Sequence, residues 1–332
     1  MFKIGTLKVS SGVILAPMAG ITDLPFRMLN RRFGCELAFV EMINVRSVSH
    51  NSKKTKQMLS SCKNDLLLGI QLLGCEPLYI QRALSILRKN YKFDILDFNA
   101  ACPAKKVTKR GEGASLLREP KKLQALLKLI VRDSAVPVTT KIRAGWDNDS
   151  VNAVEVALYA QDAGIDALFI HGRTKSQEYS GNVDYKIIKE VKKALNIPVI
   201  ASGDIFSAKM AKKMFDETGC DGIVVARGAL GNPWIFREIT ELLENNREIE
   251  RPNIDELILN MLEHLDACID FYGERNGVMI FRKFFAWYTK GFRKVRHLRE
   301  KACRAKTRTE MLGIIEELKK LWIKPSMRLS NI

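Results

Sequence analysis

The sequence contains no run of about 18 uninterrupted apolar residues, which is the length that a membrane-spanning helix requires. We therefore expect no membrane span. The N-terminal residues 1–9 lack the apolar segment of a signal peptide before the polar pair Ser10 and Ser11. We also find no internal repeat of roughly 20–50 residues and no low-complexity segment.

Cysteine is present but never in the spacing of a disulfide framework or a zinc site. The seven cysteines are Cys35, Cys62, Cys75, Cys102, Cys220, Cys268 and Cys303. They are scattered, odd in number and include no Cys-x-x-Cys pair, which favours a reducing compartment and no metal site. We expect a cytoplasmic protein in which all of them except Cys102 are ordinary core or surface thiols.

Acidic residues are too few to balance the basic ones. Lys and Arg number 54 against 37 Asp and Glu, which gives a formal net charge of +17 in 332 residues. Such an excess favours a polyanionic partner, either nucleic acid or an anionic membrane surface. A proteome that is basic throughout would give the same total, so the position of the charge along the chain decides between these interpretations.

Short apolar runs alternate with longer helical patterns over the first two thirds of the chain. The eight runs are 13–16, 37–40, 66–72, 95–98, 136–142, 167–170, 198–201 and 222–225. They read as continuous apolar stretches and not as alternating ones, which suits strands that are buried on both faces. Helical patterns lie between them, for example over 77–89, 121–131, 151–163, 185–195 and 208–215.

Eight β–α units in series predict a (β/α)8 TIM barrel of the α/β class over residues 1–243. A doubly wound sheet is the main alternative, but its fingerprint G-x-G-x-x-G is absent after the first strand. Residues 244–252 are polar and read as a linker. Residues 253–332 have helical periodicity alone, so we expect a small all-helical C-terminal domain.

Positive charge is concentrated in this helical domain. Between residues 282 and 308 only Glu300 opposes eleven basic residues: Arg282, Lys283, Lys290, Arg293, Lys294, Arg296, Arg299, Lys301, Arg304, Lys306 and Arg308. Clustering favours a surface that binds the phosphates of RNA or DNA over a generally basic composition, and over a helix lying on a membrane. The interleaved aromatic residues have helical spacing and are interpreted as the core of the bundle.

Function in a barrel collects where the strands end, so the residues at these positions are the candidate site. Gln71 and Lys141 offer polar groups to the edge of a heteroaromatic ring. The segments Ser202-Gly203-Asp204 and Ala226-Arg227-Gly228 follow the seventh and eighth strands, where barrels frequently bind phosphate. The ligand indicated is a phosphorylated planar ring, for which flavin mononucleotide (FMN) fits better than a sugar phosphate.

Cys102 follows the fourth strand and would lie on the same face of the barrel. A thiol with a pKa of about 8.5 is mostly protonated at neutral pH, so Cys102 can act as a general acid as well as a nucleophile. No histidine adjoins it in the sequence, so a Cys-His thiolate pair is not indicated.

Taken together, these motifs resemble the tRNA-dihydrouridine synthases, and most closely their bacterial B-type branch. The segments that carry the resemblance are 15–23, Gln71, 99–103 with 106–107, 141–143 with 145–146, 171–173, 202–205 and 226–236. They occur in the family order over about 220 residues, and the cysteine motif and the Pro-Trp-Ile-Phe segment at 233–236 are the most specific.

The resemblance implies a role for each matched residue. Cys102 would protonate C5 of a tRNA uracil while reduced flavin delivers hydride to C6, with NADPH (or NADH) as reductant. The FMN ligands would be Pro17, Met18, Ala19, Gln71, Lys141, His171, Ser202, Gly203, Asp204, Ala226 and Arg227. Asn99, Lys106 and Arg143 would lie close to the substrate. Apart from the resemblance, the cluster of positive charge makes Arg282, Lys283, Lys290, Arg293, Lys294 and Arg296 the expected contacts of the tRNA phosphates.

The sequence departs from the family pattern at two positions. Ala101 replaces the usual glycine before the cysteine, and Ser202 replaces the usual asparagine before Gly-Asp. Two other functions stay open at this point: a flavin oxidoreductase for a small molecule, and an RNA-binding protein without activity. The basic helical domain argues against the first, and the intact site residues argue against the second. The sequence does not specify the uridine position, other RNA substrates or the preference for NADPH, and we expect a monomer.

Overall fold

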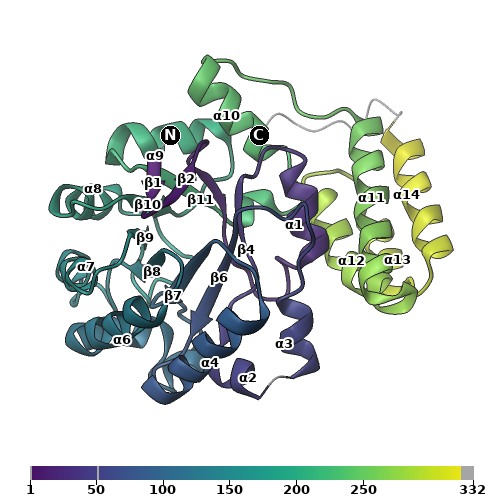
Figure 1. Cartoon of the computed structure of the whole chain (residues 1–332). Coiled ribbons are helices and arrows are strands. Elements are labelled where there is room, and N and C mark those ends of the chain that lie inside the picture. The colour runs from purple at the N-terminus through teal and green to yellow at the C-terminus, as the bar shows by residue number, and fades with distance from the viewer. Residues whose placement is uncertain (1, 51, 323–332) are drawn as a thin grey trace.

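Eight parallel strands close into a barrel in the computed structural model, which describes residues 2–50 and 52–322 (Figure 1). The strands are β3 (Val13–Leu15), β4 (Leu37–Phe39), β6 (Leu68–Leu73), β7 (Ile95–Asn99), β8 (Val138–Arg143), β9 (Ala167–His171), β10 (Val199–Ser202) and β11 (Gly222–Val225). Strand β3 pairs with both β4 and β11, and β4 also pairs with β6, which closes the ring. The predicted (β/α)8 fold is therefore confirmed.

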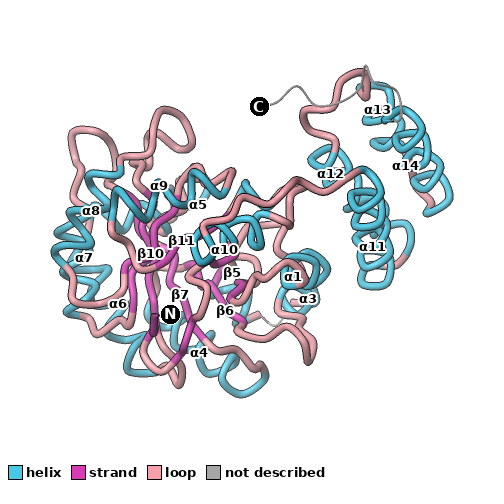
Figure 2. The backbone as a smooth tube through the Cα atoms, turned by 90° about the horizontal axis from the view of Figure 1, so that it is seen from above, coloured by secondary structure: helices cyan, strands magenta, loops and turns pink. Residues whose placement is uncertain are grey.

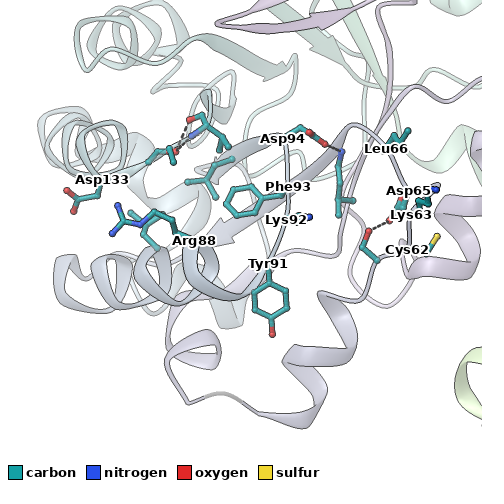
Figure 3. Close-up of a pocket in the computed structure, with 17 residues that line it drawn as sticks. Cys62, Lys63, Asp65, Leu66, Arg88, Tyr91, Lys92, Phe93, Asp94 and Asp133 are labelled. Carbon is teal, nitrogen blue, oxygen red and sulfur yellow. Dashed lines mark hydrogen bonds between the residues drawn. The ribbon is translucent and has the colours of Figure 1, made fainter.

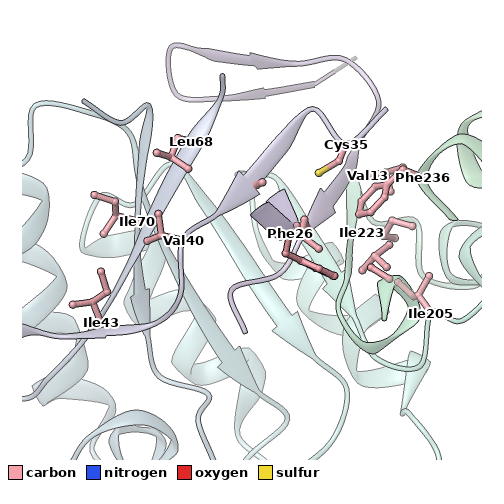
Figure 4. Close-up of a cluster of buried hydrophobic side chains, with 14 of the residues drawn as sticks. Val13, Phe26, Cys35, Val40, Ile43, Leu68, Ile70, Ile205, Ile223 and Phe236 are labelled. Carbon is pink, nitrogen blue, oxygen red and sulfur yellow. The ribbon is translucent and has the colours of Figure 1, made fainter. Parts of the chain in front are cut away.

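Helices surround the barrel and cover the outward-facing side chains of the strands. They are α1 (Leu24–Arg31), α2 (Val45–Ser49), α3 (Lys53–Met58), α4 (Pro77–Asn90), α5 (Lys105–Thr108), α6 (Pro120–Asp133), α7 (Ala153–Asp162), α8 (Tyr185–Ala194), α9 (Ala208–Thr218) and α10 (Ile235–Asn245). Outward side chains such as Val13, Ile70 and Ile223 pack into the layer between strands and helices (Figure 4). Burial on both faces explains why apolar residues predominate in the strands without a simple apolar–polar alternation.

The residues next to these outward positions in each strand point into the barrel, because successive side chains of a strand face opposite sides. The half of the interior near the amino-terminal ends of the strands is an apolar cluster. In it the rings of Phe39 and Phe169 meet edge to face, with 5.8 Å between their centres. Gly69 leaves the room for Phe39, since a Cβ at Gly69 would lie 2.3 Å from that ring. Nearer the carboxyl ends of the strands the inward positions are polar, which distinguishes them from the rest of the core.

A hairpin that the sequence did not predict covers the amino-terminal end of the barrel. It consists of β1 (Phe2–Ile4) and β2 (Leu7–Val9), which pair antiparallel. Ile4 and Val9 are fully buried in the interior cluster. A further short strand, β5 (Ile43–Asn44), pairs with β6 beyond the end of β4.

The C-terminal helices form a bundle beside α1, as Figures 1 and 2 show. They are α11 (Ile254–Tyr272), α12 (Glu274–Tyr288), α13 (Arg296–Arg304) and α14 (Arg308–Trp322). Asn253 caps α11 in a reciprocal pair with Glu256. Phe281 and Phe285 are fully buried, as expected for core aromatics. The predicted helical domain extends to residue 332, and its last ten residues lie outside the part that the structure describes.

Apolar packing joins the bundle to the barrel. The ring of Phe26 in α1 stacks on Phe284 of α12 at 5.5 Å and lies 6.0 Å from the ring of His264 in α11. All three side chains are buried. The C-terminal helices thus cover a face of α1 that would be exposed in a barrel without them.

Candidate active site

A cavity of about 510 Å³ opens at the carboxyl ends of the barrel strands. Fourteen of the site residues predicted from the sequence line it: Pro17, Met18, Ala19, Gln71, Asn99, Cys102, Lys141, Arg143, His171, Ser202, Gly203, Asp204, Ala226 and Arg227. Lys106 lies outside this lining, exposed on the short helix α5. The strand ends therefore converge as the barrel hypothesis requires.

Strand register explains why these side chains meet. Asn99 on β7 is the partner of Lys141 on β8. Arg143 on β8 and Ser202 on β10 are both partners of His171 on the intervening strand β9. All five residues are inward positions near the carboxyl ends of their strands, so their side chains share the top of the barrel.

A chain of buried hydrogen bonds connects Asp97 to the loop that carries Cys102. Asp97 accepts bonds of 2.7 Å from Thr139 Oγ1 and from Gln71 Nε2. Gln71 Oε1 accepts from Asn99 Nδ2 at 2.8 Å, and Asn99 Oδ1 accepts from the backbone N–H of Cys102 at 2.8 Å. Burial raises the pKa of Asp97 to about 6, against the hydrogen bonds from Thr139 and Gln71. This chain fixes the orientation of both amide side chains.

Cys102 is half-buried on the loop between β7 and α5. Gly113 (φ 61°) packs against this loop so closely that a Cβ there would lie 2.8 Å from the carbonyl oxygen of Cys102. Burial raises the pKa of the Cys102 thiol above its ordinary value, although a backbone bond at Ala104 and the charge of Arg143 oppose the shift. The thiol therefore carries its proton at neutral pH.

Lys141 places a cation at the base of the cavity. Its Nζ donates to Ser202 Oγ at 2.7 Å, and this hydroxyl donates to the carbonyl of Ile170 at 3.2 Å. Burial, together with the charge of Arg143, lowers the pKa of Lys141 to about 7, while the charge of Asp97 opposes this shift. Because the hydrogen bond of this buried ammonium goes to a neutral hydroxyl, an anionic ligand would stabilise its charged form.

His171 offers an unused polar atom to the same cavity. Its side chain is buried, and its Nε2 has no hydrogen-bond partner within residues 2–50 and 52–322. Burial lowers the pKa of His171 well below its ordinary value, and the charges of Lys141, Arg143, Arg173 and Arg227 lower it further. The imidazole is therefore neutral, and the cavity around it has a positive potential.

The loops after β10 and β11 lie against each other at one wall of the cavity. Asp204 has a left-handed backbone (φ 49°) and its carboxylate pairs with Arg173 and, at 2.8 Å, with Arg227. The hydrogen bond from Arg173 holds the pKa of Asp204 below its usual value. A Cβ at Gly228 would lie 2.0 Å from the carbonyl oxygen of Ile205, so the two loops touch only because Gly228 has no side chain.

Arg143 on β8 fastens the cysteine loop, which follows β7, to the loop that follows β9. Its Nε donates to the carbonyl of Ala101 at 2.8 Å. Its Nη1 donates to the carbonyls of Thr174 and Glu178, each at 2.9 Å. Arg143 is buried, and its bonds to Ala101 and Thr174 are sheltered from water. Besides lining the cavity, Arg143 holds both loops in place.

Tyr179 lines the cavity mouth and was not predicted from the sequence. It is 55% exposed, although its loop is fixed by the bond from Arg143 to Glu178. The guanidinium of Arg227 lies 4.6 Å from the centre of its ring and 5.4 Å from that of Phe206. Tyr179 follows strand β9 by eight positions in the sequence, beyond the window in which strand-end residues were sought.

The predicted phosphate-binding residues of the helical domain fall into two groups. Lys290, Arg293, Lys294 and Arg296 are exposed at or near the α12–α13 loop. Arg282 instead donates from two nitrogens to the carbonyl of Ala305, at the end of α13. Lys283 is half-buried and donates to the carbonyl of Gly20, in the loop between β3 and α1.

A second cavity of about 490 Å³ lies at the amino-terminal ends of β6, β7 and β8, where Phe93, Asp94 and Asp133 line it (Figure 3). None of the site residues predicted from the sequence lines it. In the described part of the chain, no three His, Cys, Asp or Glu side chains are grouped to hold a metal ion. No helix among the described residues has the length and apolar character to cross a membrane.

Comparison with known proteins gives consistent matches over most of the chain. Residues 14–322 match the family model described as dihydrouridine synthase (Dus). A tRNA-dihydrouridine synthase B of Pasteurella multocida is 40% identical over 289 residues, covering 87% of each chain. A probable tRNA-dihydrouridine synthase of Rickettsia bellii is 41% identical over 292 residues, covering 88% of this chain and 89% of its own.

Similarity to solved structures extends to more distant proteins. Histamine dehydrogenase from Rhizobium sp. 4-9 superposes with a TM-score of 0.55 at 15% identity, covering 80% of this chain and 50% of that one. At this identity the match reports a shared barrel fold and nothing about the reaction.

Proposed function

The chain belongs to the dihydrouridine synthase family, and on this premise we propose that it reduces the C5–C6 double bond of specific uridines in tRNA. FMN is the cofactor of this proposal, and NADPH or NADH the reductant. The observation that carries it is the convergence of the protonated Cys102 thiol, the Lys141 cation and the unpaired Nε2 of His171 on one cavity. The exposed basic residues at the α12–α13 loop support tRNA as the substrate.

The residues of the cavity fit FMN. A planar ring that bears carbonyl and imine acceptors suits the donors of Gln71 and Lys141 and the buried, unpaired nitrogen of His171. The glycine-containing loops with Arg227 suit the phosphate. The complete proposed set is Pro17, Met18, Ala19, Gln71, Lys141, His171, Ser202, Gly203, Asp204, Ala226 and Arg227. Bound and reduced by NAD(P)H, the flavin would supply the hydride for C6.

Cys102 is the proposed general acid. Its S–H bond breaks as a C–H bond forms at C5, so that hydride at C6 and proton at C5 together saturate the double bond. The thiolate left behind regains a proton from solvent. Asn99 holds the backbone N–H of Cys102 and Arg143 holds the carbonyl of Ala101, so the thiol is positioned before the substrate arrives.

The helical domain supplies the affinity for tRNA in this proposal. A uracil inside folded tRNA must be extruded before it reaches the cavity, which costs a few kcal/mol. Contacts from Lys290, Arg293, Lys294 and Arg296 to phosphates would offset this cost. Lys106 and Arg143 lie on the side of the cavity that carries Cys102 and would meet the extruded nucleotide. We also propose that the protein acts in the cytoplasm, where its proposed substrate and reductant occur, and that it is a monomer.

The test is mass spectrometry of nucleosides from tRNA that has been incubated with the purified protein, FMN and NADPH. We expect uridines at specific positions to gain the mass of two hydrogen atoms, and the gain to be lost in Cys102→Ala. A yellow protein that oxidises NADPH in air but leaves tRNA unchanged would contradict the proposal and favour a flavin enzyme for small molecules.

A further inference from the structure

Each side of Gly20 is held by a different domain. The N–H of Gly20 donates to Glu41 Oε2 of the barrel. Its carbonyl accepts from Lys283 Nζ of helix α12. Gly20 adopts a left-handed backbone (φ 71°) at the tip of the β3–α1 loop, residues 16–23. Lys283 therefore joins the helical domain to a loop of the candidate active site.

A second contact links the same loop to the helical domain. Asp23 ends the loop and caps α1 by accepting from the N–H of Phe26 at 2.9 Å. The other carboxylate oxygen accepts from the hydroxyl of Tyr272, at the end of α11, at 2.9 Å. Burial raises the pKa of Asp23, and the neighbouring charge of Lys283 opposes this shift. The half-buried ammonium of Lys283 thus already has a carbonyl and a carboxylate nearby.

The β3–α1 loop is stiff, so these contacts reach the cavity. Thr22 Oγ1 accepts from the N–H of Met18 at 3.0 Å, and the carbonyl of Met18 accepts from the N–H of Ile21 at 3.0 Å. Met18, Ala19 and Ile21 line the cavity on either side of Gly20. A displacement of the Gly20 peptide would therefore move cavity-lining atoms.

Helix α12 also supports a second loop of the cavity. A Cβ at Gly231 would lie 2.5 Å from the backbone of Trp287, so the β11–α10 loop packs directly on the end of α12. Arg227 and Leu230 of that loop line the cavity. One helix of the C-terminal domain thus contacts both loops.

We propose that Lys283 is a positioning residue: together with Tyr272 it fixes the β3–α1 loop, so that the helical domain completes the cofactor wall of the cavity. Lys283 contacts a loop carbonyl here in place of a tRNA phosphate. The inference deepens the proposed function, because it takes FMN as the ligand of that wall. The exposed Arg293 and Lys294 remain the proposed phosphate contacts.

The test compares Lys283→Met, Lys283→Arg and Tyr272→Phe with Lys320→Met, which removes an exposed lysine of α14 in the same domain. FMN affinity is measured by quenching of flavin fluorescence. Hydrogen–deuterium exchange is followed in peptides that cover residues 17–23, and the salt dependence of tRNA binding is measured in parallel. Circular dichroism shows whether each variant is folded.

We expect Lys283→Met to weaken FMN binding about tenfold, because a charge-assisted hydrogen bond to the loop is lost. The amides of residues 18–22 should exchange faster, while the salt dependence of tRNA binding stays that of the wild type. Lys283→Arg should restore most of the affinity, and Tyr272→Phe should repeat the effect more weakly. Lys320→Met should match the wild type in FMN affinity and loop exchange.

Unchanged FMN affinity and unchanged loop exchange in Lys283→Met would overturn the proposal. A reduced salt dependence with normal FMN binding would also overturn it and would assign Lys283 to a phosphate. If Lys283→Met does not fold, Tyr272→Phe decides by the same two readouts. If the wild type binds no FMN, the proposed function fails, and loop exchange alone decides the role of Lys283.

Discussion

The ammonium of Lys141 donates its hydrogen bond to the hydroxyl of Ser202, with 2.7 Å between Nζ and Oγ. This contact joins β8 to β10 across the top of β9 and leaves a cation paired with a neutral group. It also involves Ser202, one of the two positions at which we expect the sequence to depart from the family pattern. The ionisation of Lys141 should therefore be visible in ligand binding.

FMN binding should weaken as the pH rises above 7. Burial lowers the pKa of Lys141 to about 7 without ligand, so the ammonium loses its charge in this range, and an anionic ligand binds the charged form. Fluorescence titrations between pH 6 and pH 9 would measure the affinity. Lys141→Met should bind FMN more weakly and without this pH dependence. An affinity of the wild type that is constant over the range would contradict the role of Lys141.

Replacing Cys102 by Ala should abolish most turnover and leave FMN and tRNA binding intact. General acid catalysis contributes about 10²–10⁴-fold, so a loss of that size is expected in single-turnover assays. Cys62→Ala is the matched control, because Cys62 is an exposed thiol that lines the second cavity and not the candidate site. Wild-type rates in Cys102→Ala would remove the assignment of the general acid.

Exchanging both Arg293 and Lys294 for Gln should weaken the binding of different tRNAs to a similar extent and reduce the salt dependence of binding. Each phosphate contact contributes about 0.7–0.9 to the slope of log K against log salt, so the double variant should lose between one and two. Filter binding at several salt concentrations measures the slope. Lys193→Gln, an exposed change on α8, should leave the slope unchanged. If the double variant and Lys193→Gln had the same slope of log K against log salt, the tRNA would have to bind away from Arg293 and Lys294.

Gly228→Ala should disrupt the wall formed by the loops after β10 and β11. The new Cβ would lie 2.0 Å from the carbonyl oxygen of Ile205, so one loop must move. We expect weaker FMN binding and a lower midpoint of thermal unfolding. Gly313→Ala is the control, because a Cβ there meets nothing within 4 Å and alanine favours the helix by up to about 1 kcal/mol. Similar behaviour of the two variants would show that the loops do not need this contact.

Protein stability should fall below pH 6.5 partly because of His264. Burial lowers the pKa of this histidine to about 3, whereas in the unfolded chain it is about 6.5. The unfolded state therefore binds more protons between these values, and the free energy of unfolding decreases as the pH falls through this window. Urea titrations at pH 7.5 and 5 would measure it. In His264→Gln, which cannot ionise, the decrease between these pH values should be smaller; an equal decrease would assign the effect to other groups.

The eight barrel strands could be predicted because burial on both faces leaves an apolar run in the sequence. The hairpin of β1 and β2 left no such signal, since each strand has three residues and buries only one fully: Ile4 or Val9. Residues at the carboxyl ends of the strands could be assigned to the same end of the barrel, because the fold fixes the strand register and the alternation of inward and outward side chains.

Other features of the site depend on contacts that composition does not encode. Tyr179 reaches the cavity through a loop that Arg143 and Arg173 hold by bonds to its backbone carbonyls. Lys283 and Arg282 count as basic residues in the sequence, yet their bonds go to the carbonyls of Gly20 and Ala305. The density of charge predicts a basic domain, but it does not show which cations face solvent.

The stacking of Phe26 on Phe284 has a consequence for protein engineering. Chimaeras that exchange the C-terminal domain between relatives, with the aim of redirecting modification to another position in tRNA, would also exchange the surface that covers α1. Phe26 belongs to the barrel and Phe284 to the transplanted part, so a graft made at the linker alone would pair mismatched surfaces. A workable graft has to carry α1 and the Gly20 turn together with the helices that contact them.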